Sequence, residues 1–163
     1  MWTRRGMGLH WLLTGYLWLI AWLPLGNWNR QNDENLLPQL LEGKGLHMDD
    51  VFALAFVTAP ALLFWLGYRY RAFWFALAAL AVDAFWAFMQ IQSWWIPYVF
   101  GTHEPWQLKY AQGPTTKVLP SFGNHVAPDG MHLMIHVLLA AAMTAGCLAL
   151  GELWRARRVA AQT

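Results

Sequence analysis

Four titratable side chains lie close together near the start of the last apolar segment of the chain. His125, Asp129, His132 and His136 fall within twelve residues, and the last two enter the segment itself. His132 and His136 are four residues apart, so on a helix they share one face. Imidazoles inside an apolar segment are expensive to bury and usually have a function. The pattern suits proton transfer or hydrogen bonding to a ligand, and Asp129 is equally well placed to cap the helix.

A histidine pair at this spacing also suits a divalent metal. A metal site needs a further ligand at a fixed position, and none has diagnostic spacing. The candidates are Asp83, Asp49, Asp50, His47 and His125. Metal binding by His132 and His136 is therefore the weaker alternative, and the sequence identifies no cofactor.

Asp83 lies in the middle of a different apolar segment, where carboxylates are rare and usually have partners. Residues recur around it at spacings of three and four, which places them on one helix face. These residues are Ala76, Ala79, Asp83, Ala87, Gln90 and Trp94. One interpretation is a polar pocket with Asp83 and His136 as its acid–base groups. The other is a structural hydrogen bond from a protonated Asp83 to a neighbouring helix.

The remaining site candidates extend this pocket. We expect catalytic roles for Asp83, His132 and His136, and ligand contacts from Gln90, Trp86, Trp94, His125, Asp129 and Asp50. Asp50 follows His47 at the start of the second apolar segment, so helix capping is an alternative role for it. His10 and His103 are expected at the membrane interface or in a loop, without special chemistry.

Composition indicates that these residues belong to a membrane protein. The chain has 163 residues, of which 58% are hydrophobic and 12% charged, whereas soluble domains carry about 25% charged residues. The net charge of +2 and the scattered basic residues argue against nucleic acid as a partner. The single cysteine, Cys147, excludes a disulfide within one chain.

Four segments are long and apolar enough to span a membrane, namely residues 9–25, 51–68, 72–98 and 131–153. The sequence therefore predicts an all-α, polytopic membrane protein: one domain over residues 1–163 with four transmembrane helices in a bundle. Pro24 is expected to end the first span and Pro97 the third. Seven arginines flank one side and four basic residues the other, which predicts that both termini are cytoplasmic. The two sets are Arg4, Arg5, Arg69, Arg71, Arg155, Arg157 and Arg158, and Arg30, Lys44, Lys109 and Lys117.

Two long loops then face outward, at about residues 26–48 and 100–130. A short interfacial helix broken by Pro38 is expected over residues 33–42. The second loop contains four prolines, and its prolines and glycines over residues 117–130 mark tight turns. We therefore expect this loop to be ordered and to fold across the outer ends of the helices. Its expected anchors are Val118, Leu119 and Phe122.

This layout resembles the small four-span family of sterol isomerases and sigma-2-type receptors, which have cytoplasmic termini, a long first outer loop, a tight central hairpin and intramembrane acidic residues. The resemblance is one of layout, and no site residue is assigned from it. No catalytic motif such as Gly-x-Ser-x-Gly or His-Glu-x-x-His is present.

The leading hypothesis is a small integral membrane enzyme or binding protein for a lipophilic molecule, with an Asp/His site that opens to the outer face. Membrane lipid is the expected partner. One alternative is a non-catalytic subunit or accessory protein whose histidines bind a metal or a partner. The other is a small transporter, which would need a homodimer to build a pathway. A bacterial inner membrane, or its equivalent, is the expected location.

Overall fold

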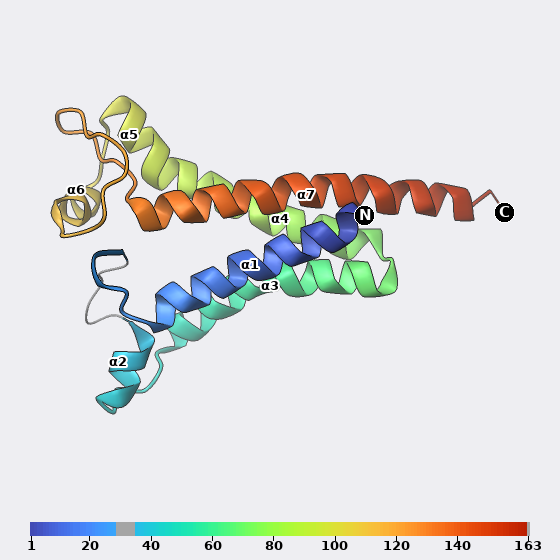
Figure 1. Ribbon diagram of the computed structural model, residues 1–163, viewed down its shortest axis with the longest axis horizontal. Helices are drawn as coiled ribbons and strands as arrows, with labels where there is room; N and C mark the ends of the chain where they lie inside the picture. Colours follow the sequence, from blue (N-terminus) through green and yellow to red (C-terminus); the bar gives the residue numbers. More distant parts are fainter. Residues whose placement is uncertain (29–34, 163) are drawn as a thin grey trace. The chain divides into compact units, whose positions relative to one another are not determined.

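The computed structural model describes residues 1–28 and 35–162, and within these ranges the chain is helical apart from its loops and one isolated antiparallel bridge between Lys117 and Asp129 (Figure 1). Arg30, Asp33 and Glu34, which entered the expectations above, lie outside the described residues. The helical elements are α1 (Trp2–Trp22), η1 (Gly26–Trp28), α2 (Leu36–Leu41), α3 (Met48–Tyr70), α4 (Phe73–Gln90), η2 (Ile91–Trp95), α5 (Ile96–Phe100), α6 (Pro105–Gln112) and α7 (Gly130–Ala160).

Three helical stretches of the described chain are long and apolar enough to cross a membrane. They are Met48–Tyr70, Phe73–Phe100 and Gly130–Val159, and they coincide with the second, third and fourth expected spans. The length and apolar composition of these helices are those of an integral membrane protein. α1 begins at Trp2, seven residues before the expected start of the first span, and it includes Arg4 and Arg5. A fourth membrane crossing through α1 stays a prediction.

Pro97 does not end the third apolar segment, contrary to expectation. The helix widens into the π-helical element η2 and continues through α5 to Gly101, whose φ of 72° closes it. Pro97 has no N–H to offer the carbonyl four residues earlier. The side-chain amide of Gln107 replaces that donor, because its Nε2 donates to the Ser93 carbonyl at 2.6 Å. The proline is tolerated because α6 satisfies the backbone group that it leaves open.

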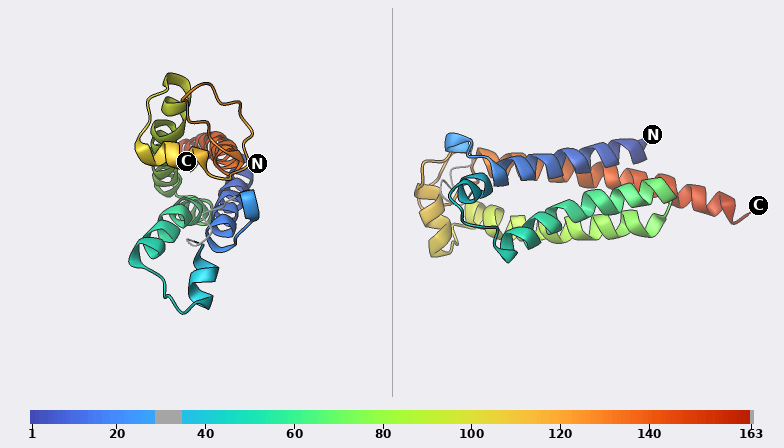
Figure 2. Two further views of the ribbon diagram at one scale, coloured as in Figure 1. Left: turned by 90° about the vertical axis from the view of Figure 1, so that its left-hand side faces the viewer. Right: turned by 90° about the horizontal axis from the view of Figure 1, so that it is seen from below.

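The described chain forms two compact units, which we treat separately. The first comprises Met1–Trp18, His47–Phe85 and Val137–Thr163, and the second comprises Leu19–Leu46 and Trp86–His136. In the first unit α3 and the start of α4 run antiparallel, joined by a tight turn at Arg71 and Ala72 (Figures 1 and 2). This is the hairpin that the short link predicts.

The core of the first unit contains side chains from four helices. Its buried members are Phe64, Ala76, Ala79, Ala149 and Leu153, with Trp2, Met7, Leu63 and Leu150 packed against them. Small residues let the backbones approach closely, as is typical of membrane helices. A Cβ at Gly146 of α7 would lie 2.7 Å from Leu80 Cδ2, and one at Gly6 of α1 would lie 2.8 Å from Phe64 Cζ.

The second unit contains the loop before α7 and a helix that the sequence analysis missed. α6 begins after Glu104, whose backbone N–H donates to the Gln107 side chain at 2.6 Å, and Pro105 occupies its first turn. The pattern Glu-Pro-x-Gln is a capping signature that could have identified this helix. The Thr116 backbone N–H donates to the Asn27 carbonyl at 2.8 Å, which joins this loop to η1.

For the loop before α7, the prediction that Val118 and Phe122 anchor it to the helices is wrong. Val118 and Phe122 are more than half exposed, whereas Val126 is fully buried. In α2 the expected break at Pro38 is also wrong, because Pro38 lies in the first turn of the helix, where its missing N–H is not needed.

Candidate functional site

Asp129 and His132 form a hydrogen-bonded pair at the start of α7. Asp129 Oδ1 accepts from the His132 backbone N–H at 3.0 Å and from the His132 ring Nδ1 at 2.8 Å. The first bond caps the helix, as the sequence predicts. The second fixes the ring so that Nδ1 carries the proton. His132 Nε2 has no hydrogen-bond partner among the described residues, so it is the nitrogen that can accept a proton or contact a ligand.

Tyr110 of α6 holds the other carboxylate oxygen. Its hydroxyl donates to Asp129 Oδ2 at 2.8 Å. Burial raises the pKa of the Asp129 carboxyl, but hydrogen bonds from the His132 ring, the His132 backbone and the Tyr110 hydroxyl hold that pKa below its ordinary value. Burial and the charge of Asp129 raise the pKa of the Tyr110 hydroxyl. Asp129 is thus held as an anion, with both of its carboxylate oxygens hydrogen-bonded.

Aromatic rings surround the His132 imidazole. The Trp94 indole lies 3.9 Å from it between ring centroids, tilted by 39°, and Tyr110 meets it edge-on at 5.4 Å. The His132 side chain is 13% exposed and that of Asp129 only 3%. The imidazole is therefore the more exposed member of the pair. We refer to Trp94, Tyr110, Asp129 and His132 as the His132 site.

His136, one helical turn further along α7, pairs with Gln90. Its Nε2 donates to Gln90 Oε1 at 3.0 Å, and Trp95 lies 5.7 Å away between ring centroids. The Nδ1 atom of His136 is buried and has no hydrogen-bond partner among the described residues. An unpaired buried acceptor costs about 1–3 kcal/mol, so a donor from a ligand or a water molecule would be favoured there.

Asp83 lies in the first unit and pairs with His10, a residue that the sequence analysis did not select. Asp83 is fully buried, which confirms that it faces protein rather than lipid. Its Oδ2 lies 2.8 Å from His10 Nε2. The expectation that His10 is interfacial is wrong, because only 1% of it is exposed. The buried face of α1 includes Gly6, His10, Leu13, Thr14 and Leu17, and this three-and-four spacing was the available signal.

Helices α1, α3, α4 and α7 all contribute atoms around the His10 ring. Its Nδ1 donates to the Gly6 carbonyl at 2.6 Å, and its Nε2 is the nitrogen that faces Asp83 Oδ2. Phe64 stacks on the ring with centroids 4.5 Å apart, and the absence of a side chain at Gly146 leaves room beside it. Asp83 Oδ1 is buried and unpaired among the described residues. Both nitrogens of His10 are therefore occupied, in contrast to His132.

The other predicted site residues have separate surroundings. His125 Nδ1 donates to the Tyr98 carbonyl at 2.8 Å, and His125 also lines a surface hollow of about 220 Å³ with Lys117 and Asn124. Trp86 is half-buried in the second unit. Asp50 Oδ2 accepts from the His47 backbone N–H at 3.0 Å, which is a capping contact at the start of α3.

Metal binding by His132 and His136 would need a third ligand, and none of the described residues is placed to complete such a site. Within residues 1–28 and 35–162, no group of three or more His, Cys, Asp or Glu side chains is arranged to hold a metal ion. Two nitrogens of the histidine pair already have protein partners, His132 Nδ1 with Asp129 and His136 Nε2 with Gln90.

No protein-family model, curated protein or solved structure matches this chain.

Proposed function

We propose that this chain is a four-span integral membrane protein, with both termini cytoplasmic, that binds a lipophilic molecule at the His132 site and exchanges a proton with it. The observation that carries the proposal is the 2.8 Å bond between Asp129 Oδ1 and His132 Nδ1. A carboxylate that accepts from one imidazole nitrogen fixes the tautomer and orients the other nitrogen, an arrangement that suits histidine as a general base. The aromatic surroundings suit an apolar ligand.

The neighbouring residues extend this proposed site. His136 would accept a hydrogen bond at its buried Nδ1 atom, and Gln90 would hold its ring in place. Trp95, close to the His136 ring, would add apolar contact area. In this proposal Asp83 has a structural role through His10 instead of a direct role in proton transfer.

Native mass spectrometry of the detergent-purified chain, followed by extraction of bound molecules, tests the binding step. The wild-type protein should retain a lipophilic species, and His132→Gln should reduce its occupancy at least about tenfold, the equivalent of about 1.4 kcal/mol. His47→Gln is the matched control, because His47 is exposed at the start of α3. Equal retention by wild type and His132→Gln would contradict the proposal.

A second measurement separates an enzyme from a binding protein. If His132 exchanges a proton with a carbon of the ligand, incubation in D₂O should add deuterium to the recovered molecule. The added mass should be absent with His132→Gln and strongly reduced with Asp129→Asn. Retention of the molecule without deuterium uptake would assign binding alone.

The second candidate function is a non-catalytic membrane subunit. The observation that favours it is the His10–Asp83 pair, which uses the mid-segment carboxylate to join α1 to α4. A subunit should co-purify with a stoichiometric protein partner under mild extraction, and a self-sufficient enzyme or binding protein should not.

A further inference from the structure

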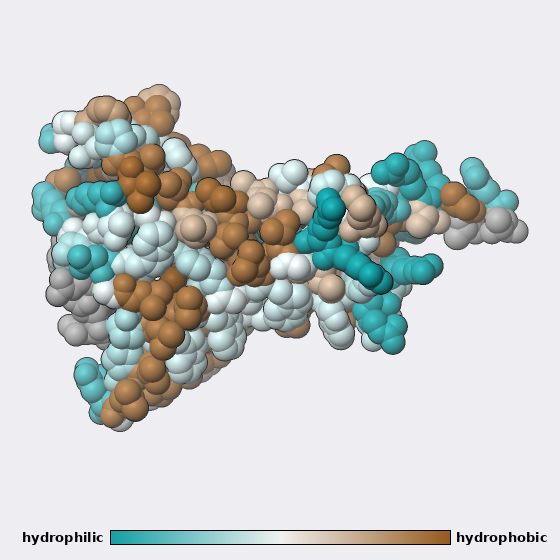
Figure 3. Space-filling view, in the orientation of Figure 1, coloured by the Kyte–Doolittle hydropathy of each residue, from teal (hydrophilic) through white to brown (hydrophobic). Residues whose placement is uncertain are grey.

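A hollow of about 520 Å³ lies in the first unit, where α1 begins and α3 ends. Its lining residues come from α1, α3, the turn after α3, and α7: Thr3, Tyr68, Arg71, Glu152, Leu153, Ala156 and Arg157. The volume falls within the range of about 300–1,000 Å³ that is typical of small-molecule sites. Figure 3 shows hydrophilic side chains gathered where α1 begins and α7 ends. This part of the molecule has no role in the function proposed above.

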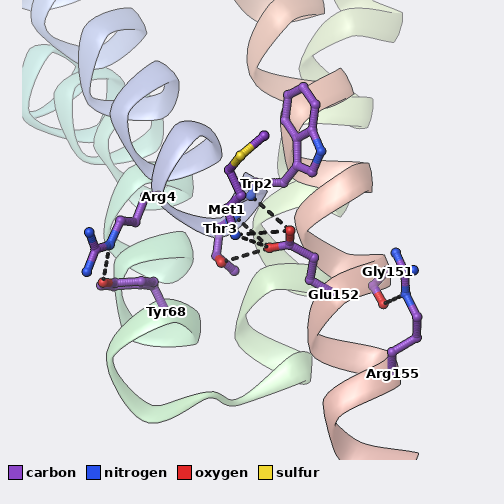
Figure 4. Close-up of polar contacts among 8 residues, drawn as sticks. All are labelled: Met1, Trp2, Thr3, Arg4, Tyr68, Gly151, Glu152 and Arg155. Atoms are coloured by element: carbon purple, nitrogen blue, oxygen red, sulfur yellow. Dashed lines mark hydrogen bonds and ion pairs between the residues drawn. The ribbon is translucent and has the colours of Figure 1, made fainter.

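The charge around this hollow is positive. Arg71 and Arg157 line it, and Arg4 Nε donates to the hydroxyl of Tyr68 at 3.2 Å (Figure 4). No carboxylate forms an ion pair with any of these arginines in the part of the chain that the structure describes.

The single acidic residue in the lining is already occupied. The Glu152 carboxylate accepts from the backbone N–H groups of Trp2 and Thr3 at 3.0 and 3.1 Å, and from the terminal amine at 3.1 Å. Figure 4 shows these contacts converging on Glu152 from one side. The hollow therefore presents guanidinium groups without a competing free carboxylate.

Arg71 ends α3 in a backbone conformation that is unusual for a residue with a side chain. Its φ of 50° and ψ of 33° lie in the left-handed region, which is unfavourable for any residue with a Cβ. Among the described residues other than glycine, Arg71 alone has a positive φ. Glycine is the usual residue where a helix ends in this way. Strained residues of this kind cluster at functional sites, so the outlier supports a role for the Arg71 side chain.

The surrounding aromatic residues indicate a membrane boundary. Arg157 lies over the Trp74 ring at 5.8 Å, Arg158 over Trp154 at 5.1 Å, and Arg5 over Trp2 at 4.9 Å. Tryptophan is enriched at the level of lipid headgroups, and arginine is enriched on the cytoplasmic side, where anionic lipids lie. α3 ends here, the helical stretch Phe73–Phe100 begins here with α4, and α7 passes this level; all three are long enough to span a membrane. The ligand chemistry that fits both the arginines and this location is a phosphate ester attached to acyl chains.

We propose that this hollow binds the phosphate headgroup of an anionic phospholipid, held by Arg71 and Arg157. A guanidinium group matches phosphate oxygens with paired N–H donors. Leu153 and Ala156 supply the apolar side of the lining, against which the glycerol and upper acyl chain would lie. Arg4 and Tyr68 complete the polar side.

Titration of the full chain in detergent, followed by native mass spectrometry, tests this proposal. The probes are dioctanoyl phosphatidylglycerol, dioctanoyl phosphatidylcholine and inorganic phosphate. The anionic lipid should bind more tightly than the zwitterionic one, and its affinity should fall as salt increases. Arg71→Gly and Arg157→Gln should each weaken it about fivefold, which corresponds to about 1 kcal/mol for each basic residue near an anionic surface.

Two variants separate binding from folding and from net charge. Arg71→Gly relieves the left-handed strain, so its thermal midpoint should stay equal or rise while its affinity for the anionic lipid falls. The double variant Arg155→Gln with Arg158→Gln removes two charges outside the lining. Arg155 donates to the Gly151 carbonyl of its own helix and lies on the other side of α7 from Glu152 (Figure 4). This control should bind the anionic lipid as the wild type does.

Three outcomes would overturn the proposal. The first is equal affinity for the anionic and zwitterionic lipids. The second is a loss of affinity in the control double variant that equals the combined losses of Arg71→Gly and Arg157→Gln, which would reduce the effect to net charge. The third is full competition by inorganic phosphate at concentrations similar to those of the lipid, which would assign a free anion instead of a lipid.

Discussion

Asp83 and Asp129 each hold a histidine at 2.8 Å, but the two pairs differ in the second nitrogen of the ring. In His10 that nitrogen donates to the Gly6 carbonyl, so the ring has no free position. In His132 it has no partner among the described residues, and the side chain is partly exposed. At the residue scale, the first pair leaves neither ring nitrogen without a partner, whereas the second leaves His132 Nε2 without one among the described residues.

The Asp129 pair predicts an acid-sensitive second unit. Its hydrogen bonds hold the folded-state pKa of Asp129 below its ordinary value of about 3.9. The stabilisation is therefore fully present above about pH 4 and is lost as the pH falls through the lower folded-state pKa. Asp129→Asn should flatten this acid dependence in thermal unfolding from pH 3 to 7. Asp49→Asn, in an exposed position, is the control. An unchanged acid slope in Asp129→Asn would contradict the assignment.

The His10 pair predicts a strong coupling energy. Removing one partner leaves a buried polar group unpaired, so His10→Leu or Asp83→Leu should each cost about 1–3 kcal/mol of unfolding free energy, and more if the pair is ionised. The double variant should cost clearly less than the sum of the two. A double-mutant cycle by unfolding in mixed micelles measures this difference. Additive losses would show that the two side chains do not depend on each other.

At the scale of helices, close approach in the first unit depends on glycine. A Cβ at Gly146 would lie 2.7 Å from Leu80 Cδ2 and 3.4 Å from His10 Cε1, whereas Gly15 of α1 has open space around it. Gly146→Ala should therefore lose about 1–3 kcal/mol through overpacking. Gly15→Ala should gain up to about 1 kcal/mol through helix propensity. Thermal midpoints of the two variants give the comparison, and a Gly146→Ala variant as stable as Gly15→Ala would rule out tight packing here.

At the scale of the whole molecule, the open question for experiment is the number of membrane crossings. Three helical stretches of the described chain meet the length and composition of a span. The proposed fourth crossing through α1 follows from the apolar run over residues 9–25, and its orientation follows from the distribution of basic residues. In a Cys147→Ala background, cysteines at positions 44 and 117 should react with an impermeant reagent from outside, and a cysteine at position 70 only from the cytoplasm. All three positions are exposed. Cytoplasmic labelling at position 117 would exclude this topology.

The sequence by itself determined the all-helical class, three helices long and apolar enough to span a membrane, the hairpin between α3 and α4, the Asp129 cap and the burial of Asp83. These features follow from hydropathy, helical periodicity and capping, which depend on neighbouring residues. Only the tertiary structure decided the partners. Asp83 pairs with His10, 73 residues away, and Gln107 bonds the backbone that Pro97 leaves open. Such pairs depend on how two helices are rotated and shifted against each other when they pack. The residues next to each partner in the sequence do not determine that arrangement.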